Sequence, residues 1–370
     1  MTSAKTLIHS AFAETDVHLN GSRPWDIQVH EERFYSDLLV GGSLAFGEGY
    51  MNGVWDCEEL DGMIFRLMRG RIDRHISMPL LLPAQFRAKV LYLRNQSRTS
   101  LVAETHYDLG NDFYADMLDS RMQYTCAYFK KTDDLDAAQE RKLDLVCRKL
   151  QLREGERVLE LGGGWGGFAR FAAERYGCEV ESYNISGQQV KYARELCQGL
   201  PVTIHHQDYR EAKGTFDKVV SIGICEHVGR KHYHDFLALQ KARLKDDGLI
   251  LLHTIGCNES KSTTDPWINK YIFPGGFLPS LEQLFEAANG QLVAEDVHNF
   301  GAHYDRTLMA WHARFEKSWP RHEAQFGERF RRMWRYYLLS CAGGFRARQL
   351  QLWQIVFSKN GREGGYESIR

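Results

Sequence analysis

Residues 157–167 read RVLELGGGWGG, an apolar run that passes directly into a glycine-rich turn. A stretch with helical spacing, residues 168–176, follows at once. Glycines in such a turn permit unusual backbone angles and let the main chain approach a ligand closely. A strand, a glycine turn and a helix in this order predict a nucleotide-type ligand site, and the turn alone fits a dinucleotide fingerprint equally well.

The same rhythm of strand, turn and helix continues along the chain. Short apolar or β-branched runs predict strands, and helical spacing between most of them predicts helices. Alternating β and α elements imply an α/β fold with a parallel, doubly wound sheet. The predicted strands are 157–162, 178–183, 201–206, 216–222 and 248–255, and the predicted helices are 168–176, 187–197 and 230–243.

Two acidic residues favour S-adenosylmethionine over NAD as the ligand of this sheet. Glu160 ends the first strand two positions before Gly162, where a carboxylate suits a cationic methionine moiety better than a pyrophosphate. Asp208 follows the third strand, where it can accept a hydrogen bond from an adenine amino group, and Tyr209 beside it can pack on the base. The alternative is an ordinary α/β turn followed by a surface aspartate.

The composition of the whole chain limits the classes of protein. With 370 residues, 43% hydrophobic and 26% charged, it is expected to fold into one large globular domain and a smaller one. Lys and Arg total 47 against 48 for Asp and Glu, which argues against nucleic acid as a partner. Eight cysteines without a C-x-x-C pair and the lack of a signal peptide predict a reduced, cytoplasmic protein.

The first 95 residues carry no cofactor motif and are predicted to form a small, mainly helical N-terminal domain, with residues 96–370 as the catalytic domain. Between Arg66 and Arg98 there are eight Lys or Arg and one acid, Asp73, a net charge of +7. Apolar residues at helical spacing between the charges predict basic amphipathic helices. Two interpretations stay open: docking on an anionic membrane, or a solvated helical face that packs on the larger domain.

Six blocks of sequence resemble the cyclopropane-fatty-acid synthase family, and they occur in the order of that family. The resemblance covers most of residues 95–358. It implies the Rossmann-like class I S-adenosylmethionine methyltransferase fold, with a mostly parallel seven-stranded sheet and a smaller helical N-terminal domain. The blocks are HYDLGNDFYADMLDSRMQYTCAYF (106–129), ICEHVG (224–229), LLHTIG (251–256), DPWINKYIFPGG (265–276), NFGAHYDRTLMAW (299–311) and YYLLSCAGGFRARQLQLWQ (336–354).

The resemblance also implies where the cofactor S-adenosylmethionine binds. Its methionine carboxylate would meet Tyr124 and Thr125, and its adenine would meet Asp208 and Tyr209. Between them lie Glu160, Gly162, Gly164, Asn184, Ile185, Ser186 and Gln189, which would line the cofactor and bracket its ribose. The chain departs from the usual pattern of the family at three places: it has Glu160-x-Gly162-Gly163-Gly164 for Asp-x-Gly-Cys-Gly, Asn184 for Thr and Thr125 for Ser.

The chemistry of an isolated olefin sets the demands on the remaining residues. The olefin is a weak nucleophile that must attack the sulfonium methyl directly, so alignment and exclusion of water carry much of the step. Ring closure then requires a base that removes a proton from the added methyl group. The resemblance implies a bound bicarbonate ion as this base, with no metal. It would be held by the backbone of Cys126 and Ile255 and by the side chains of Glu226, His253 and Tyr304.

Each of these residues also has an ordinary structural interpretation. Glu226 can cap the next helix, and His253 in an apolar strand can be a hydrogen-bonded core histidine. Tyr304 can be a packing residue, and Cys126 a buried thiol. Cys341 is a landmark of the family that is sometimes regarded as catalytic, and it is kept as a candidate although olefin methylation needs no thiolate.

These features together predict the activity and the partners of the chain. We expect transfer of a methylene group to the cis double bond of an unsaturated phospholipid in the bilayer, giving a cyclopropane acyl chain. The protein is expected to be a homodimer at the inner face of the membrane, without a spanning helix, because no apolar run approaches about 20 residues. The alternatives are a methyltransferase that makes a methyl-branched lipid or acts on a small amine, and a lipid- or nucleic-acid-binding protein without catalysis.

Overall fold

The computed structural model describes residues 4–73, 109–260 and 263–370, and the chain forms two compact units. Unit 1 comprises residues 1–102, 263–275 and 308–350, and unit 2 comprises residues 103–262, 276–307 and 351–370. Each unit is therefore assembled from three separate segments. The division of function between residues 1–95 and 96–370 stays a prediction.

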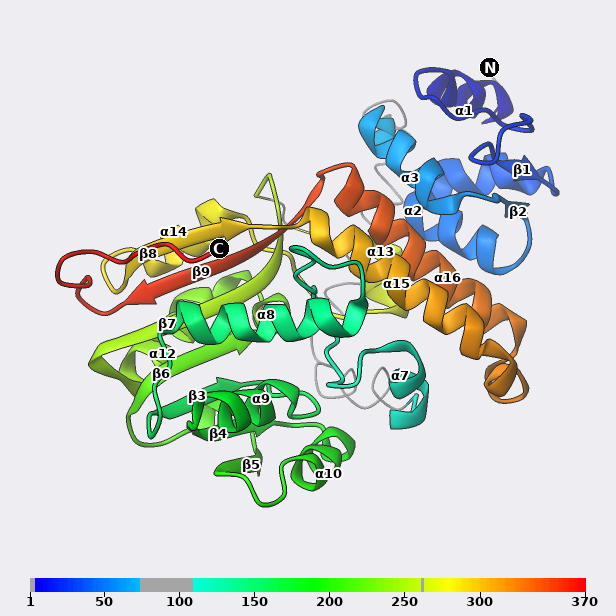
Figure 1. The fold of residues 1–370 in the computed structure, drawn as a ribbon. Helices are drawn as coiled ribbons and strands as arrows, with labels where there is room; N and C mark the ends of the chain where they lie inside the picture. The colour runs from blue at the N-terminus through cyan, green and yellow to red at the C-terminus, as the bar shows by residue number, and fades with distance from the viewer. Residues whose placement is uncertain (1–3, 74–108, 261–262) are drawn as a thin grey trace. The chain divides into compact units, whose positions relative to one another are not determined.

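Unit 2 contains a seven-stranded sheet with the order β5-β4-β3-β6-β7-β9-β8 (Figure 1). The neighbours among β5, β4, β3, β6 and β7 pair in parallel, and β8 pairs with β9 antiparallel. This arrangement confirms the predicted α/β fold and its mostly parallel, doubly wound sheet. The strands are β3 (Arg157–Leu161), β4 (Glu179–Asn184), β5 (Val202–His206), β6 (Phe216–Ile222), β7 (Leu244–Cys257), β8 (Val293–Asn299) and β9 (Leu350–Ser358).

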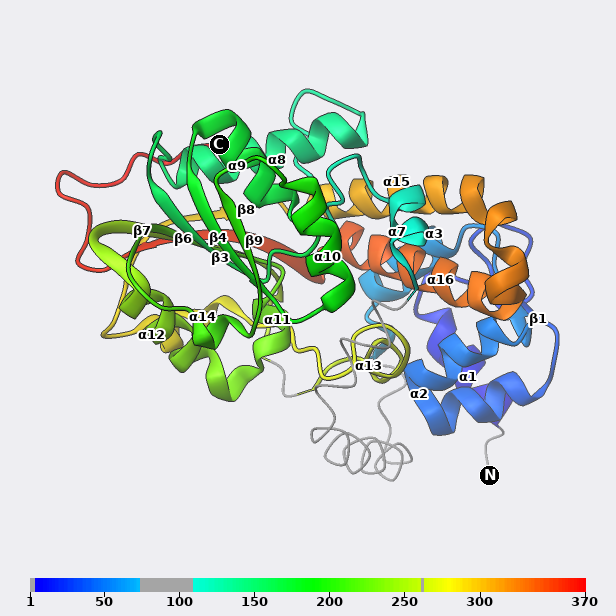
Figure 2. The ribbon, with the colours of Figure 1, turned by 90° about the horizontal axis from the view of Figure 1, so that it is seen from below.

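Helices cover both faces of this sheet (Figures 1 and 2). Alternate residues of a strand point to opposite faces, so Val158 packs in one hydrophobic core and Leu159 in the other. One face carries α8 (Leu135–Lys149), α9 (Gly167–Tyr176) and α10 (Gly187–Leu196), and the other carries α11 (Cys225–Val228), α12 (Tyr233–Arg243) and α14 (Leu281–Ala288). Unit 2 also contains α7 (Asn111–Met117) and the short helical turns η3 (Tyr209–Glu211) and η4 (Arg230–His232).

Unit 1 is mainly helical around an aromatic core. Trp267 lies 4.5 Å from Tyr336 between ring centroids, and Phe46 stacks on Trp55 at 4.3 Å. Its elements are α1 (Ala4–Ala13), β1 (Gln28–Val29), α2 (Arg33–Met51), β2 (Trp55–Asp56), α3 (Leu60–Arg69), α13 (Pro266–Tyr271), the larger part of α15 (Ala302–Ser318), η5 (Trp319–Arg321) and α16 (Glu323–Arg346).

The apolar face of α3, where the basic stretch begins, is buried inside unit 1. Ile64 and Leu67 are buried, and a Cβ on Gly343 of α16 would lie 2.9 Å from the Cβ of Ile64. These side chains are therefore not available for insertion into a bilayer. The remainder of the stretch, residues 74–98, lies outside the described residues. Among the described helices none is long and apolar enough to cross a membrane.

Candidate active site

The glycine turn lies at the carboxyl end of β3, where the order of the strands reverses. This is the position at which open α/β sheets bind their ligands. Gly162 and Gly164 have φ angles of 74° and 54°, which favour glycine. A Cβ at Gly162 would overlap Ile224, whereas a Cβ at Gly164 would point into open space. The backbone at Gly164 is thus accessible to a ligand, as its predicted role requires.

Glu160 and Gly163 lie close together under the glycine turn. Glu160 is 4% exposed, and burial raises the pKa of its carboxyl to about 7. A Cβ at Gly163 would overlap Ser182 Oγ and would lie 2.7 Å from Glu160 Oε2. Ser182 and Glu160 therefore occupy the space that a side chain at position 163 would need. The two departures from the usual family pattern thus lie in contact with each other.

Four of the predicted cofactor residues form one hydrogen-bond network at the end of β4. Asn184 Nδ2 donates to the backbone oxygen of Gly164 (3.0 Å) and to Gln189 Oε1 (2.8 Å). Its Oδ1 accepts from the N–H of Ser186 (3.0 Å), which caps α10. Ile185 beside them is 55% exposed, an unusual exposure for an isoleucine. The amide of Asn184 thus fixes the glycine turn to α10, and Ile185 offers apolar surface at the same edge.

Asp208 and Tyr209 follow β5 as predicted. Asp208 accepts from the N–H of Arg210 (2.9 Å) and forms an ion pair with its guanidinium (2.7 Å), which holds the pKa of the carboxyl below its usual value. Tyr209 packs edge-on against Phe236 of α12 at 5.7 Å. An adenine amino group would therefore share an ionised Asp208 with Arg210.

Tyr124 and Thr125 belong to an irregular segment between α7 and α8 that lies against the glycine turn. The ring of Tyr124 is 5.4 Å from that of Tyr114, which in turn is 4.9 Å from Trp165 of the turn. A Cβ on Gly223, directly after β6, would lie 3.0 Å from the methyl group of Thr125. The structure thus brings both predicted residues to the carboxyl edge of the sheet.

Glu226 lies on α11, directly after β6, and reaches across to β7. Its Oε1 accepts from the N–H of Ile255 (2.6 Å), so it does not cap the following helix. Its Oε2 is buried and has no hydrogen-bond partner in the described part of the chain. Burial raises the pKa of this carboxyl to about 7. The N–H of Ile255, predicted to donate to an anion, is thus already engaged by Glu226.

His253, two residues before Ile255 on β7, is also incompletely hydrogen-bonded. Its Nδ1 lies 3.2 Å from the amide nitrogen of Gln354 on β9, while its Nε2 is buried without a partner among the described residues. Burial lowers its pKa well below the usual value, so the imidazole is neutral. In the tautomer in which Nδ1 accepts from Gln354, Nε2 carries the proton and can donate. His253 is therefore not a fully hydrogen-bonded core histidine.

The other three candidates differ in their surroundings. Tyr304 is buried in the first turn of α15, four positions after Phe300, whose ring is 5.8 Å from that of His253. Cys126 is fully buried, and burial raises the pKa of its thiol. Cys341 lies on α16 of unit 1, where burial raises the pKa of its thiol to about 12. Both thiols stay protonated near neutral pH, which does not suit a nucleophile.

The free atoms of this edge fit a small hydrogen-bonding anion. Glu226 Oε2 is an acceptor and His253 Nε2 is a donor, and both are buried. Bicarbonate has one hydroxyl group to donate and oxygens that accept, so it offers a matching group for each of these atoms. Buried polar atoms without partners are uncommon and are often completed by a bound molecule.

Comparison with known proteins identifies the family. The sequence profile of the mycolic acid cyclopropane synthetase family matches residues 94–355. The cyclopropane-fatty-acyl-phospholipid synthase of Escherichia coli K12 is 45% identical over 371 residues, which cover 98% of this chain and 95% of that protein. The chain belongs to the cyclopropane and mycolic acid synthase family. It is thus an enzyme, an S-adenosylmethionine-dependent methyltransferase.

Solved structures support the same assignment for the fold and the co-substrate. The mycolic acid cyclopropane synthase CmaA1, complexed with SAH and CTAB, is 30% identical, has a TM-score of 0.66 and matches 71% of this chain and 98% of its own. Coclaurine N-methyltransferase is 22% identical with a TM-score of 0.69 over 85% of this chain and 99% of its own, which shows the shared fold. The class I methyltransferase fold predicted from the sequence is confirmed, with S-adenosylmethionine as co-substrate.

Sequence reasoning missed several polar residues that hold the site. Gln354 ends the family block at residues 336–354, but only the pairing of β9 in the sheet places it beside His253. Gln139 and Lys142 are fully buried on α8 and bond to the segment that carries Thr125. Their signal was available: both interrupt the apolar face of an amphipathic helix three residues apart.

Proposed function

We propose that the chain transfers a methylene group from S-adenosylmethionine to the cis double bond of an unsaturated acyl chain in a membrane phospholipid, giving a cyclopropane ring. The observation that carries this proposal is the pair of free buried atoms, Glu226 Oε2 and His253 Nε2, at the sheet edge that bears the glycine turn. A simple methyl transfer to an amine has no need of such an anion site. The name of the Escherichia coli relative supports the phospholipid substrate.

The cofactor half of the site orients S-adenosylmethionine, which supplies the reactive methyl group. The accessible backbone at Gly164 and the amide network of Asn184 would form its cradle, and Asp208 would accept from the adenine. The carboxyl of Glu160 under the turn adds negative charge when ionised, which favours a cationic sulfonium. Positioning of this kind converts an encounter with the olefin into a near-attack geometry.

The base half is proposed to hold bicarbonate, which when bound supplies the base that removes a proton from the added methyl group. His253 Nε2–H would donate to the anion, and Glu226 Oε2 would accept its hydroxyl proton, which fixes the anion's orientation. The backbone N–H of Cys126 and the hydroxyl of Tyr304 would complete the donors, and Ile255 would act through Glu226. Burial of His253 and Glu226 keeps water away, so that a carbocation on the lipid is not trapped as an alcohol.

A direct assay tests the reaction. The protein is incubated with S-adenosylmethionine and vesicles of an unsaturated phospholipid, and the lipids are analysed by mass spectrometry before and after catalytic hydrogenation. We expect a product one CH₂ heavier than the substrate that takes up no hydrogen under conditions that reduce alkenes. A heavier product that still takes up hydrogen would indicate methyl branching with retention of an alkene, and would contradict ring closure.

A second assay tests the anion. Enzyme prepared free of carbonate should form little cyclopropane, and added bicarbonate should restore the rate in the wild type. Added bicarbonate should not restore the rate in Glu226→Gln. Full activity of carbonate-free enzyme would exclude bicarbonate as the base while leaving the methyl transfer in place.

We propose in addition that the enzyme is a homodimer that associates peripherally with the inner face of the membrane. Its substrate lies in the bilayer, so the enzyme must reach an acyl chain from the surface. Light scattering after size-exclusion chromatography tests the dimer, and sedimentation with anionic vesicles tests the association. A monomer at working concentration, or protein that stays in the supernatant at low salt, would contradict these two points separately.

A further inference from the structure

Two buried polar residues of α8 point at one segment of the chain. Lys142 Nζ donates to Gln123 Oε1 (2.6 Å) and to Thr125 Oγ1 (2.9 Å). Gln139 Nε2 donates to the backbone oxygens of Thr125 (2.8 Å) and Gln123 (3.3 Å). Both side chains are completely buried. Burying a lysine costs several kcal/mol unless its charge is used, so its presence here requires a reason.

The segment that they hold, residues 119–129, has no helix or strand of its own. Its backbone groups must therefore find side-chain partners. Asp119 accepts from the N–H groups of Arg121 and Gln123, both at 2.9 Å. Farther along, the N–H of Ala127 donates to Thr307 Oγ1 (3.0 Å). The shape of this segment is thus set by side chains and not by a regular hydrogen-bond ladder.

This segment also has little freedom to move at the glycine turn. A Cβ on Gly167, the first residue of α9, would overlap the backbone oxygen of Arg121 and the amide nitrogen of Gln123. The residues that follow, Tyr124, Thr125 and Cys126, are those proposed to meet the methionine carboxylate and the anion. Small errors in the position of reacting groups cost large factors in rate.

We propose that Gln139 and Lys142 are positioning residues, which clamp residues 123–126 in the shape that binds S-adenosylmethionine and presents the N–H of Cys126 to the anion. The inference rests on the proposed roles of Tyr124, Thr125 and Cys126. Neither residue touches the substrate; both act through the segment. Lys142 holds the segment more strongly than Gln139 does, because a charged donor forms the stronger hydrogen bond.

The charges around Lys142 support a role between the two halves of the site. Burial lowers the pKa of Lys142 to about 8, while Asp119, Cys126 and Glu160 oppose this shift. Lys142 in turn helps to lower the pKa of His253, after burial itself and together with Lys149. The ammonium therefore acts on Glu160 at the cofactor half and on His253 at the base half.

The first test compares two buried lysines of the same helix. Lys142→Met and Gln139→Leu should each weaken cofactor binding about tenfold or more in isothermal titration and lower kcat as well. The control is Lys149→Met, since Lys149 is also completely buried on α8 but pairs with Asp296 at 3.2 Å, away from the segment. It should lower the melting temperature similarly while cofactor affinity stays within about twofold. The proposal would be overturned if Lys149→Met weakened cofactor binding equally, or if Lys142→Met and Gln139→Leu both bound the cofactor with normal affinity.

The second test measures how cofactor affinity depends on pH, because a merely structural role of Lys142 would not change this dependence. The ammonium is present below pH 8 and is lost above it, so the wild-type affinity for S-adenosylmethionine should fall as pH rises through about 8. The neighbouring groups titrate elsewhere: Asp119 near 6, Glu160 near 7, Cys126 far above and His253 far below. The α-amino group of S-adenosylmethionine also titrates near pH 8, so the variants serve as the reference. Lys142→Arg keeps its charge and should fall less than the wild type between pH 7 and 9; Lys142→Met should be weaker at every pH and fall no more than Lys142→Arg. An equal fall in the wild type and in both variants would contradict the assignment.

A third measurement separates this inference from the proposed cofactor site. Tyr124→Ala should weaken cofactor binding if the proposed site is right. Normal affinity in Tyr124→Ala would refute that site, and the clamp with it. Weak binding in Tyr124→Ala together with normal binding in Lys142→Met and Gln139→Leu would refute only the clamp.

Discussion

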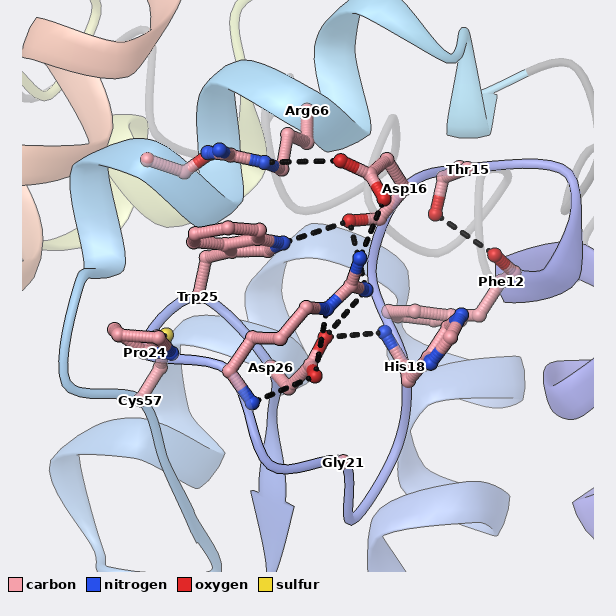
Figure 3. Close-up of polar contacts among 12 residues, drawn as sticks. Phe12, Thr15, Asp16, His18, Gly21, Pro24, Trp25, Asp26, Cys57 and Arg66 are labelled. Atoms are coloured by element: carbon pink, nitrogen blue, oxygen red, sulfur yellow. Dashed lines mark hydrogen bonds and ion pairs between the residues drawn. The ribbon is translucent and has the colours of Figure 1, made fainter.

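Asp26 in unit 1 and Glu226 in unit 2 are buried carboxylates with opposite surroundings. Asp26 accepts from the N–H groups of His18 and Arg23 and from the guanidinium of Arg23 (Figure 3). Burial alone would raise its pKa, but these donors lower it to about 2. Glu226 accepts from the N–H of Ile255, and burial outweighs its hydrogen bonds and raises its pKa to about 7. One carboxylate stabilises a loop, and the other keeps an oxygen free for a ligand.

Other buried or half-buried charges of the two units can be compared in the same way. Unit 1 pairs its charges: Arg332 with Asp56, Arg346 with Asp61 and Arg331 with Glu316. In unit 2, the buried carboxylate oxygens that lack a partner among the described residues belong to Glu160 and Glu226, both at the carboxyl edge of the sheet. A buried carboxylate oxygen without a partner is destabilising, so these two carboxylates mark the edge at which a ligand is expected.

The largest expected effect is on the rate of ring formation. Glu226→Gln, His253→Ala and Tyr304→Phe should each reduce turnover on unsaturated phospholipid by about 100-fold or more, because each removes a group of the base site. Cofactor affinity should stay near that of the wild type in isothermal titration. The matched control, Asp26→Asn, should lower the free energy of unfolding by about 1–3 kcal/mol without changing turnover of the folded enzyme.

A collapse of cofactor binding in all three variants would show that the two halves of the site are not separable. Loss of turnover in Asp26→Asn at full folding would remove the contrast between the two carboxylates.

The second prediction concerns stability against pH. A carboxyl whose pKa is raised in the folded state costs stability as pH rises from its unfolded value to the folded one. Glu226→Gln should therefore be more stable than the wild type at pH 8, by about 1–3 kcal/mol, and equal to it below about pH 4.5. Asp26→Asn should show the reverse. Its free energy of unfolding should lie below that of the wild type by the full amount above about pH 4, and the difference should shrink as pH falls towards 2. Urea unfolding at a series of pH values measures both, and a Glu226→Gln variant less stable at pH 8 would contradict the idea of a free buried oxygen.

Much of unit 2 was predictable from local sequence. The runs at 157–162 and 216–222 became β3 and β6, and the glycine turn lies where the sheet order reverses. The antiparallel pair β8 and β9 was not predicted, because β8 is mostly exposed or half-buried and lacks a continuous apolar run. The segments 263–275 and 308–350 give no local sign that they belong with unit 1.

For the site, residue types were predictable but their partners were not. Glu226 and His253 were predicted as neighbours of an anion, yet the bonds to Ile255 and Gln354 depend on strand register. Long-range pairing of this kind leaves no trace in a local window. The same holds for Lys142, whose partner Thr125 is 17 positions away.

A third, smaller effect is expected at the pair Glu160 and Gly163. Gly163→Cys should lower the free energy of unfolding by about 1–3 kcal/mol and weaken cofactor binding, because the new side chain overlaps Ser182 Oγ and approaches Glu160. Glu160→Asp shortens the neighbouring side chain. In the double variant it should restore part of the free energy of unfolding and part of the cofactor affinity. A double-mutant cycle measures the coupling, and additive losses would show that the two residues do not compensate.

The smallest effect should come from the basic stretch of unit 1, because its described arginines are exposed or half-buried and are partly paired. Arg66 pairs with Asp16 at 3.2 Å and lies 3.7 Å above the ring of Trp25 (Figure 3). Reversing Arg66 would disturb this loop, so it is left intact. Arg69 is exposed, and Arg71 pairs with Asp73 at 3.3 Å. These two arginines are the better positions for testing docking on a membrane.

Reversal of both, Arg69→Glu with Arg71→Glu, should weaken sedimentation with anionic vesicles at low salt, since each basic residue near such a surface contributes about 1 kcal/mol. The difference from the wild type should vanish at high salt, where the Debye length falls to about 3 Å. Arg33→Glu on α2 is the control, because Arg33 is exposed and paired with Glu31 outside the stretch. Cofactor affinity should be unchanged in all of these variants. If the double reversal sediments like the wild type at low salt, these arginines form only a solvated face, and the contact with the membrane must lie elsewhere.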